Sequence, residues 1–249
     1  MKKEILDLYE KFVDIKERGW IKSIKNGNNG VGLTFEHLLG IQQNELEIPD
    51  YNGVVEIKTK RKTSCSYIIL FSCTPTGPNY HEVEMIKNRY GYPHKLLPQY
   101  KVLNNSVYGN RKNKIGCNFY FKLDVDRVSK KIYLIVYDKN KIEIEKSTYW
   151  DFDILEEKLN RKLKNLAVIK AYSKKEEFIE WFKYSDFQVY SLKSFDKFIE
   201  LIEKGIIRLN FKLNIKTKGE KLGQIHDHGT SFDILEKDIP KLYNKYNIK

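Results

Sequence analysis

Apolar residues recur along the chain with two periods, and the period predicts which secondary structure each segment forms. Between Glu4 and Arg18 the spacing is roughly helical, which predicts a first amphipathic helix. Further helices are predicted in LTFEHLL, EVEMIKNRY, FDILEEKLNRKL and SFDKFIELIEKG. Alternating or continuously apolar runs predict strands in SYIILFS, NFYFKLDVD, KIYLIVYD, LAVIKAYSKK and IIRLNFKLNIK. This mixture predicts an α/β (α+β) fold with a mixed sheet flanked by helices.

The character of the pattern changes near residue 173, after which EEFIEWFKYSDFQVYS is aromatic and alternating. We therefore expect one lobe of residues 1–173 and a smaller C-terminal lobe of residues 174–249, packed closely because no Ser/Pro-rich linker separates them. Residues 76–116 are rich in Gly, Pro, Asn, Tyr and basic residues, which predicts an excursion that faces the ligand. We also expect the strand at 66–72 to pair with the strand that follows Asn52-Gly53.

Charge narrows the range of partners. The 45 lysines and arginines exceed the 33 aspartates and glutamates, which gives a net charge of +12. Such a balance favours a polyanion such as nucleic acid, although solubility alone remains an alternative. The odd number of cysteines and the lack of a CxxC pair argue against a disulfide framework or a structural zinc site. The N-terminus does not resemble a signal peptide, and no apolar run approaches the ~20 residues that cross a bilayer, so we expect a cytoplasmic protein.

The segment PDYNGVVEIKTK (49–60) carries the strongest candidate chemistry. Side chains alternate along a strand, so Glu56 and Lys58 project to the same side. Asn52-Gly53 favours a tight hairpin, which brings Asp50 back toward that strand. A strict two-residue turn would place Asp50 on the wrong face, whereas a three-residue loop with a bulge at Gly53 would set it opposite Val54 and turn it toward Glu56. We predict the bulged form.

Two converging carboxylates repel each other unless a cation joins them, and oxygen ligands suit Mg²⁺. Asp50 and Glu56 are therefore candidate metal ligands, with Lys58 placed to orient a water or neutralise charge on phosphorus. Glu36, on the predicted helix LTFEHLL, is expected to lie close to this motif. The alternative is a solvated edge strand with an ion pair. The glycines before that helix lack the Gly-Lys-Ser/Thr ending of a phosphate-binding loop, which argues against a nucleotide cofactor.

The strand IIRLNFKLNIK has one apolar and one polar face. Its polar face carries basic and amide side chains without an acid, the residue types that read base edges and phosphates, although an ordinary solvated face is the alternative. His226 and His228 would share a face if the following segment is extended. Base or phosphate contact is favoured there over zinc, because Asp227 between them points the other way. The candidate DNA contacts of this region are Arg208, Asn210, Lys212, His226, Asp227 and His228.

The segments GxxGVGLTFEHLL, PDYNGVVEIK, LFSCTPTGP, NRYG, SVYGNRK, YWDFDILEEKLNRKL, AVIKAYSK and HDHGTSF together resemble the MvaI/BcnI-type restriction endonucleases, relatives of the MutH nicking enzyme in the PD-(D/E)xK superfamily. The resemblance implies a monomeric, Mg²⁺-dependent type II enzyme. It also implies double-stranded DNA as substrate, cut at short, nearly palindromic CC-centre-GG sites by a catalytic lobe and a DNA-recognition lobe. A cognate DNA methyltransferase would belong to the same system.

By position, the resemblance makes Asp50 and Glu56 the metal-binding acids, Lys58 the catalytic lysine and Glu36 the helical acid of the active site. It makes the HDHG segment a base-contacting element of the recognition lobe. We also expect DNA contacts from Lys60, Asn110 and Arg111. A MutH-like strand-specific nickase and a DNA-binding module without catalysis are the competing interpretations.

Overall fold

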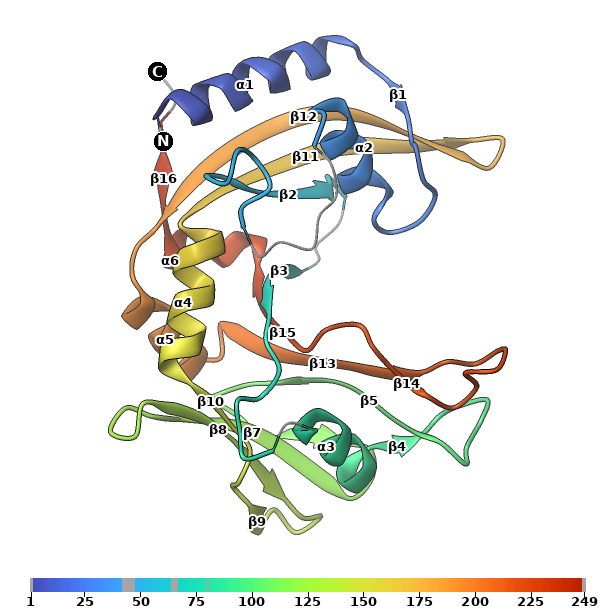
Figure 1. The fold of residues 1–249 in the computed structure, drawn as a ribbon, viewed down its shortest axis with the longest axis vertical. Coiled ribbons are helices and arrows are strands. Elements are labelled where there is room, and N and C mark those ends of the chain that lie inside the picture. Colours follow the sequence, from blue (N-terminus) through green and yellow to red (C-terminus); the bar gives the residue numbers. More distant parts are fainter. Residues whose placement is uncertain (1, 42–47, 64–66, 80, 248–249) are drawn as a thin grey trace. The chain divides into compact units, whose positions relative to one another are not determined.

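The computed structural model describes residues 2–41, 48–63, 67–79 and 81–247. These residues form two compact units, and the chain passes from one to the other several times (Figure 1). Unit 1 comprises residues 1–66, 158–193 and 240–249, and unit 2 comprises residues 67–157 and 194–239. None of the described helices is long and apolar enough to cross a membrane.

Unit 1 is built on a five-stranded sheet of order β1-β12-β11-β2, with β16 also paired to β12. Strand β2 runs parallel to β11, and the other pairs are antiparallel. The strands are β1 (Ile21–Lys22), β2 (Glu56–Arg61), β11 (Asn165–Glu176), β12 (Ile179–Leu192) and β16 (Tyr243–Tyr246). The helices are α1 (Lys2–Glu17), α2 (Gly30–Leu38), the C-terminal part of α4 (Phe152–Leu163) and α6 (Ile239–Leu242).

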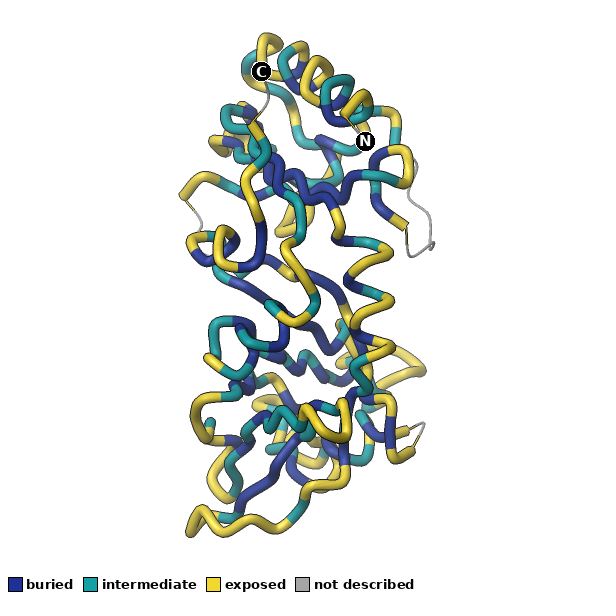
Figure 2. The backbone as a smooth tube through the Cα atoms, turned by 90° about the vertical axis from the view of Figure 1, so that its left-hand side faces the viewer, coloured by how far each residue is buried: buried dark blue, intermediate teal, exposed yellow. Residues whose placement is uncertain are grey.

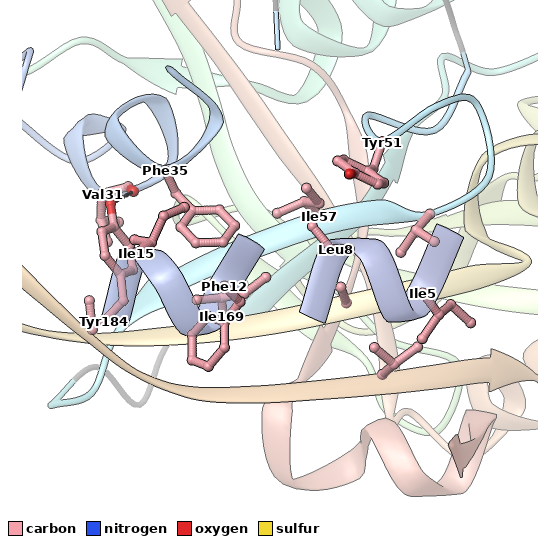
Figure 3. Packing of buried hydrophobic residues seen from close by; sticks show 14 of the residues in the cluster. Ile5, Leu8, Phe12, Ile15, Val31, Phe35, Tyr51, Ile57, Ile169 and Tyr184 are labelled. Atoms are coloured by element: carbon pink, nitrogen blue, oxygen red, sulfur yellow. Dashed lines mark hydrogen bonds between the residues drawn. The ribbon is translucent and has the colours of Figure 1, made fainter. Parts of the chain in front are cut away.

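Helical spacing in α1 explains how this sheet is covered. Its residues Ile5, Leu8, Phe12 and Ile15 recur every three to four positions and are all buried. They join one hydrophobic cluster with the odd-numbered residues of β11, Ala167, Ile169 and Ala171 (Figure 3). The even-numbered residues of β11 therefore project from the opposite face of the sheet.

Unit 2 contains two further sheets. One has the order β10-β8-β7-β6, with β9 paired to β8, and the other has the order β3-β15-β13-β5-β4, with β14 paired to β13. Buried positions follow the strands, as Figure 2 shows by colour. The strands of the first sheet are β6 (Asn113–Ile115), β7 (Phe119–Asp126), β8 (Lys131–Tyr137), β9 (Glu143–Glu145) and β10 (Tyr149–Asp151).

The second sheet of unit 2 carries the polar strand singled out in the sequence. Its strands are β3 (Tyr67–Ser72), β4 (Tyr92–Pro93), β5 (Lys101–Val107), β13 (Ile207–Ile215), β14 (Ile225–Asp227) and β15 (Ser231–Leu235). The helices of this unit are α3 (Glu82–Tyr90), α5 (Phe195–Glu203), the short 3₁₀ turn η1 (Glu236–Asp238) and the N-terminal part of α4. Ser194 caps α5 by accepting a hydrogen bond from the Lys197 backbone N–H.

The predicted helices and most predicted strands are present, and the α+β class is confirmed. Three predictions about organisation were wrong. Strand β3 pairs with β15 and not with β2, which instead pairs with β11. The lobes do not meet near residue 173, because β12 forms a long hairpin with β11 in unit 1. Residues 76–116 are not an excursion, since they include α3 and three strands of the unit 2 sheets. Strand pairing over long sequence distances decides all three.

A partly buried ion pair ties the glycine-rich turn before α2 to the sheet. Arg61 donates from Nε and Nη2 to the two carboxylate oxygens of Glu180, both at 2.7 Å. The same guanidinium donates to the carbonyl oxygens of Gly27 and Asn28 at 2.9 and 3.1 Å. Hydrogen bonds from Arg61 hold the pKa of Glu180 below its ordinary value of 4.5. Arg61 therefore satisfies a buried carboxylate and two loop carbonyls together.

Replacing Arg61 with alanine leaves Glu180 buried without its partner, so we expect the free energy of unfolding at neutral pH to fall by about 2 to 3 kcal/mol. Because the pKa of Glu180 is lowered in the fold, its contribution is present above 4.5 and is lost as the pH falls through the lowered pKa. Urea unfolding should thus show a smaller difference between the two proteins at acid pH. The double variant Arg61→Ala/Glu180→Leu should recover part of the loss. An equal loss at both pH values would contradict this assignment.

Candidate active site and nucleic-acid interface

The turn at Asn52-Gly53 is a three-residue loop closed by an isolated antiparallel bridge between Tyr51 and Val55. The Tyr51 N–H donates to the Val55 carbonyl at 2.9 Å, and the Val54 N–H donates to the Tyr51 carbonyl at 2.9 Å. Asn52 and Gly53 both have positive φ, at 51° and 67°. A three-residue loop is present, but it comprises residues 52–54, one position later than the predicted pairing of Asp50 with Val54 requires. That pairing is wrong, because the bridge places Asp50 across from Glu56.

Two contacts hold this loop in place beside the sheet. The buried Tyr51 donates its hydroxyl proton to Asp7 on α1. The side-chain amide of Asn165, the first residue of β11, donates to the Val54 carbonyl at 3.1 Å. Asp50 is fixed in turn, because its Oδ2 accepts a hydrogen bond from the Ile57 backbone N–H at 2.9 Å. Its carboxylate therefore lies at the start of β2.

Glu56 is the most deeply buried acid of the site, since 0% of the residue's surface is exposed. Its Oε1 accepts a hydrogen bond from Lys58 Nζ at 2.6 Å and lies 3.6 Å from Lys162 Nζ. No described residue donates a hydrogen bond to Oε2. Burial raises the pKa of Glu56, the charge of Asp50 adds to the rise, and Lys58 opposes it. The site thus holds a carboxylate with one oxygen still to be satisfied.

Glu36 reaches the same region from α2. This helix lies close against β2, since a Cβ on Gly32 would come within 3.0 Å of Thr59 Oγ1. The pKa of Glu36 is raised, first by burial and then by the charge of Asp50, while Lys58 and Lys162 oppose the rise. The charge of Asp50 thus acts on both Glu36 and Glu56. Glu36 also lines a pocket of about 360 Å³ together with residues such as Lys25 and His37.

These groups fit a divalent cation of the kind that keeps most of its waters. Over the described ranges, no three acidic, histidine or cysteine side chains lie close enough together to hold a metal ion among them. Mg²⁺ in proteins is often held by only one or two carboxylates with waters completing the shell. The unpartnered Oε2 of Glu56 beside the carboxylate of Asp50 matches that need, since a cation would satisfy the oxygen and reduce the repulsion.

The structure adds Lys162 to the site, which the sequence did not reveal. Lys162 stands in the last turn of α4 and contacts Glu56 because α4 leads directly into β11, whose Leu166 pairs with Glu56. Tyr243 is fully buried at the start of β16, and burial raises the pKa of its hydroxyl, with the charge of Glu56 adding to the rise. The basic end of the α4 helix was visible in the sequence, but nothing there linked it to Glu56.

In unit 2, the strand predicted to carry DNA contacts has the predicted alternation. The odd-numbered residues of β13 are buried and the even-numbered ones are half-buried. Each even-numbered side chain already has a polar partner on the same face. Arg208 pairs with Asp233 at 3.3 Å and stacks on Tyr67, with Cζ 3.3 Å from the ring centroid. Other contacts link Asn210 to Ser106, Lys212 to Ser231 and Asn214 to Asn104.

The predicted strand face is thus neither purely basic nor simply solvated. Asp233 on the neighbouring strand β15 supplies the acid that β13 lacks, and it is only 2% exposed. Its other oxygen accepts from Ser231 at 2.7 Å, and Ser231 accepts from Lys212 at 2.8 Å. A connected network therefore orients the two cations. Within the described residues, nothing accepts a hydrogen bond from the buried Nε of Arg208.

The remaining predicted contacts lie in different surroundings. Arg111 is exposed and stacks on Tyr108, with Cζ 3.5 Å from the ring centroid, and Asn110 packs against Gly205. His226 and His228 are exposed and lie side by side, with ring centroids 4.0 Å apart. Asp227 accepts a hydrogen bond from the Gly229 N–H and so shapes the turn. Lys60 is in unit 1 and only 7% exposed, which makes it the least accessible candidate.

Comparisons with known proteins agree on one family. The model of the MvaI/BcnI restriction endonuclease family matches residues 9–243. A solved complex of the restriction endonuclease MvaI with its cognate DNA substrate is 34% identical, with a TM-score of 0.90, and covers 99% of this chain and 98% of that one. The structure of MvaI in the absence of DNA is 33% identical, with a TM-score of 0.64 and the same coverage. Among curated proteins, none matches this chain.

The family match spans nearly the whole chain, from α1 to the start of β16, and the identity to MvaI extends over both units. The resemblance read from the sequence motifs is thereby confirmed. Proteins of this family are DNA-cleaving hydrolases, and the charge and the clustered carboxylates agree with that activity. The chain belongs to the MvaI/BcnI restriction endonuclease family.

Proposed function

We propose that this protein is a Mg²⁺-dependent type II restriction endonuclease with a PD-(D/E)xK active site in unit 1. Its substrate would be double-stranded DNA containing a short CC-centre-GG sequence. The observation that carries the proposal lies at the start of β2, where Asp50 Oδ2 accepts a hydrogen bond from the Ile57 N–H and no described residue donates to the buried Oε2 of Glu56. The charge of Asp50 also acts on Glu36. The enzyme would act as a monomer, and a cognate DNA methyltransferase would belong to the same restriction system.

In this proposal Asp50 and Glu56 hold the metal ion and Glu36 lies at the edge of the site. When bound, the cation would polarise the phosphate and lower the pKa of an attacking water. Lys58 has its ammonium 2.6 Å from Glu56 Oε1, so it can exchange that contact for a water or a phosphate oxygen and neutralise charge that develops on phosphorus. Burial of Glu56 keeps bulk water from screening these charges.

Lys162 has a supporting role in the proposal. Its ammonium lies 3.6 Å from Glu56 Oε1 and its charge lowers the pKa of both Glu36 and Glu56, against the effect of burial. A positive charge that keeps these acids ionised favours cation binding. Lys162 is therefore a positioning residue, which acts on the metal-binding acids and not on the substrate.

Recognition is proposed to lie on the polar face of the β13 sheet in unit 2. MvaI has been crystallised with its cognate DNA, and this chain matches that complex with a TM-score of 0.90. The proposed base and phosphate contacts are Arg208, Asn210, Lys212, His226, Asp227, His228, Asn110 and Arg111. Among them Arg208 is the best prepared to read a base, because the Tyr67 ring and Asp233 fix the plane of its guanidinium.

Replacing Glu56 with glutamine or Lys58 with methionine should lower DNA cleavage by about a hundredfold or more, because each change removes a charge from the reaction centre. Plasmid digestion in Mg²⁺ measures the loss, and a gel shift without Mg²⁺ should show that DNA binding persists. Lys164→Met, an exposed lysine just after α4, is the matched control. A wild-type protein that leaves only nicked circles would support the MutH-like nickase, and binding without any cleavage would leave a DNA-binding module.

Replacing Lys162 with methionine should raise the pKa of Glu56, because a neighbouring positive charge is lost. A larger fraction of Glu56 is then protonated at a given pH, so the acid limb of the cleavage profile should move to higher pH. We expect cleavage near neutral pH to fall by about tenfold. Lys162→Arg should restore the profile and Lys164→Met should not alter it. An unshifted acid limb in Lys162→Met would overturn the positioning role.

Replacing Arg208 with lysine keeps the charge but removes the planar fork that stacks on Tyr67. Affinity for the target duplex should fall by about 10- to 100-fold, while affinity for duplexes without the target should stay the same. Fluorescence anisotropy without Mg²⁺ measures both affinities. An equal loss on both duplexes would mean that Arg208 contacts only the phosphate backbone.

A further inference from the structure

One face of the unit 1 sheet continues past the candidate active site along the β11–β12 hairpin. Strand β2 ends at Arg61, which pairs with Ala171, whereas β11 runs on to Glu176 before it turns into β12 (Figure 1). The hairpin therefore extends beyond its neighbour, and among the described residues only the two-residue strand β1 pairs with its far half. The side chains on this extension are available to a partner on the face that carries the active site.

Register shows which side chains share the face of Lys58. Lys58 pairs with Val168 in the parallel ladder, so the even-numbered residues of β11 project with it. Farther along, Tyr172 pairs with Lys183 and Lys174 pairs with Trp181, and Trp181 pairs with Lys22 of β1. The irregularity between β11 and β12 lies before these pairs, at Lys170/Ala171, and leaves their register intact. We call Lys22, Lys62, Tyr172, Lys174, Trp181 and Lys183 the ribbon face.

The ribbon face combines positive charge with exposed aromatic surface. Lys62 Nζ lies 4.5 Å from the centroid of the Tyr172 ring, and Lys174 Nζ lies 4.7 Å from that of Trp20. Lys22 and Lys183 are exposed, and Tyr172 is 46% exposed. Two carboxylates lie among these groups, Asp186 beside Lys62 and Glu176 beside Lys174, so the lysines outnumber the acids two to one. Cations interleaved with aromatic rings suit a nucleic-acid backbone.

The tip of the hairpin is built at a cost in stability. Its two turn residues, Glu177 and Phe178, both have positive φ, at 48° and 69°, a conformation that favours glycine or asparagine. Phe178 is 95% exposed, so its ring gains no hydrophobic burial that could offset the cost of the positive φ. A strained backbone that presents an exposed aromatic side chain is a recurring mark of a contact site.

We propose that the ribbon face and Phe178 bind the DNA duplex that flanks the recognition sequence. This rests on the proposed function, since the flank is defined by the target that unit 2 reads. From Val168 to Lys174 the strand rises about 20 Å, which corresponds to about six base pairs of B-DNA. The four lysines lie in the rows of Tyr172 and Lys174, at the far end of this length, where they neutralise phosphates, and Phe178 packs against the sugar edge beyond them. The contact adds affinity that is independent of sequence.

The proposal is tested with two duplexes that carry the same target, one with flanks of about 3 bp and one with flanks of about 12 bp. Fluorescence anisotropy without Mg²⁺ gives the affinities. Wild-type protein should bind the long duplex about tenfold more tightly and with a steeper salt dependence. The triple variant Lys62→Gln/Lys174→Gln/Lys183→Gln should lose this advantage, with a salt slope lower by about 2 to 3. Lys2→Gln/Lys3→Gln/Lys16→Gln, on α1 across the sheet, should retain it.

Phe178→Gly provides an independent readout, because glycine relieves the positive φ. Its thermal unfolding midpoint should rise while its affinity for the long duplex falls, an opposition that a purely structural residue would not produce. Equal affinity of the wild-type protein for short and long duplexes would overturn the proposal. Cleavage of the short duplex by wild-type protein in Mg²⁺ tests the proposed function separately, so the failure of one is distinguished from the failure of the other.

Discussion

The burial of one carboxylate, that of Glu56, is the constraint on which the candidate active site depends. Strand β2 places Ile57 in the hydrophobic core and turns Glu56 to the opposite face, where it is wholly removed from water. A buried charge is unfavourable without cations close to it. Lys58 supplies one from the same strand and Lys162 supplies another from α4. Even so, no described residue donates a hydrogen bond to Oε2 of Glu56, and the proposed function assigns this oxygen to a cation.

The parallel pairing of β2 with β11 explains why these groups meet. Helix α4 ends at Leu163 and β11 begins at Asn165, so the last turn of the helix lies beside the first residues of the strand. Leu166 pairs with Glu56, and Asn165 holds the loop that carries Asp50. One ladder therefore aligns the loop, the acid and the second lysine. The backbone hydrogen bonds between β2 and β11 therefore position both the core residues and the residues of the candidate active site.

The two units use their positive charge in different ways. In unit 2, Arg208 and Lys212 are held by Asp233 and Ser231, so their donors are oriented before any ligand arrives. Such preorganisation limits the side-chain entropy lost on binding and suits groups that must distinguish bases. On the ribbon face of unit 1, Lys62 and Lys174 contact an aromatic ring and an exposed or half-exposed carboxylate, and Lys22 and Lys183 are exposed, so their charge acts with little geometric selectivity. In the proposed function, the oriented donors of unit 2 would serve specificity and the lysines of the ribbon face would serve affinity.

Local pattern by itself determined the longer helices, most of the longer strands, the alternation of β13 and the contact of Glu56 with Lys58, because each depends on residues only a few positions apart. Tertiary structure alone decided that β3 pairs with β15, that β12 returns along β11 in unit 1, and that Lys162 and Asp233 join their sites. The strand pairings join distant segments through backbone hydrogen bonds that any sequence of suitable polarity can form, and they bring Lys162 and Asp233 to their ion-pair partners. Side-chain periodicity specifies which face of a strand is buried but not which strand lies beside it.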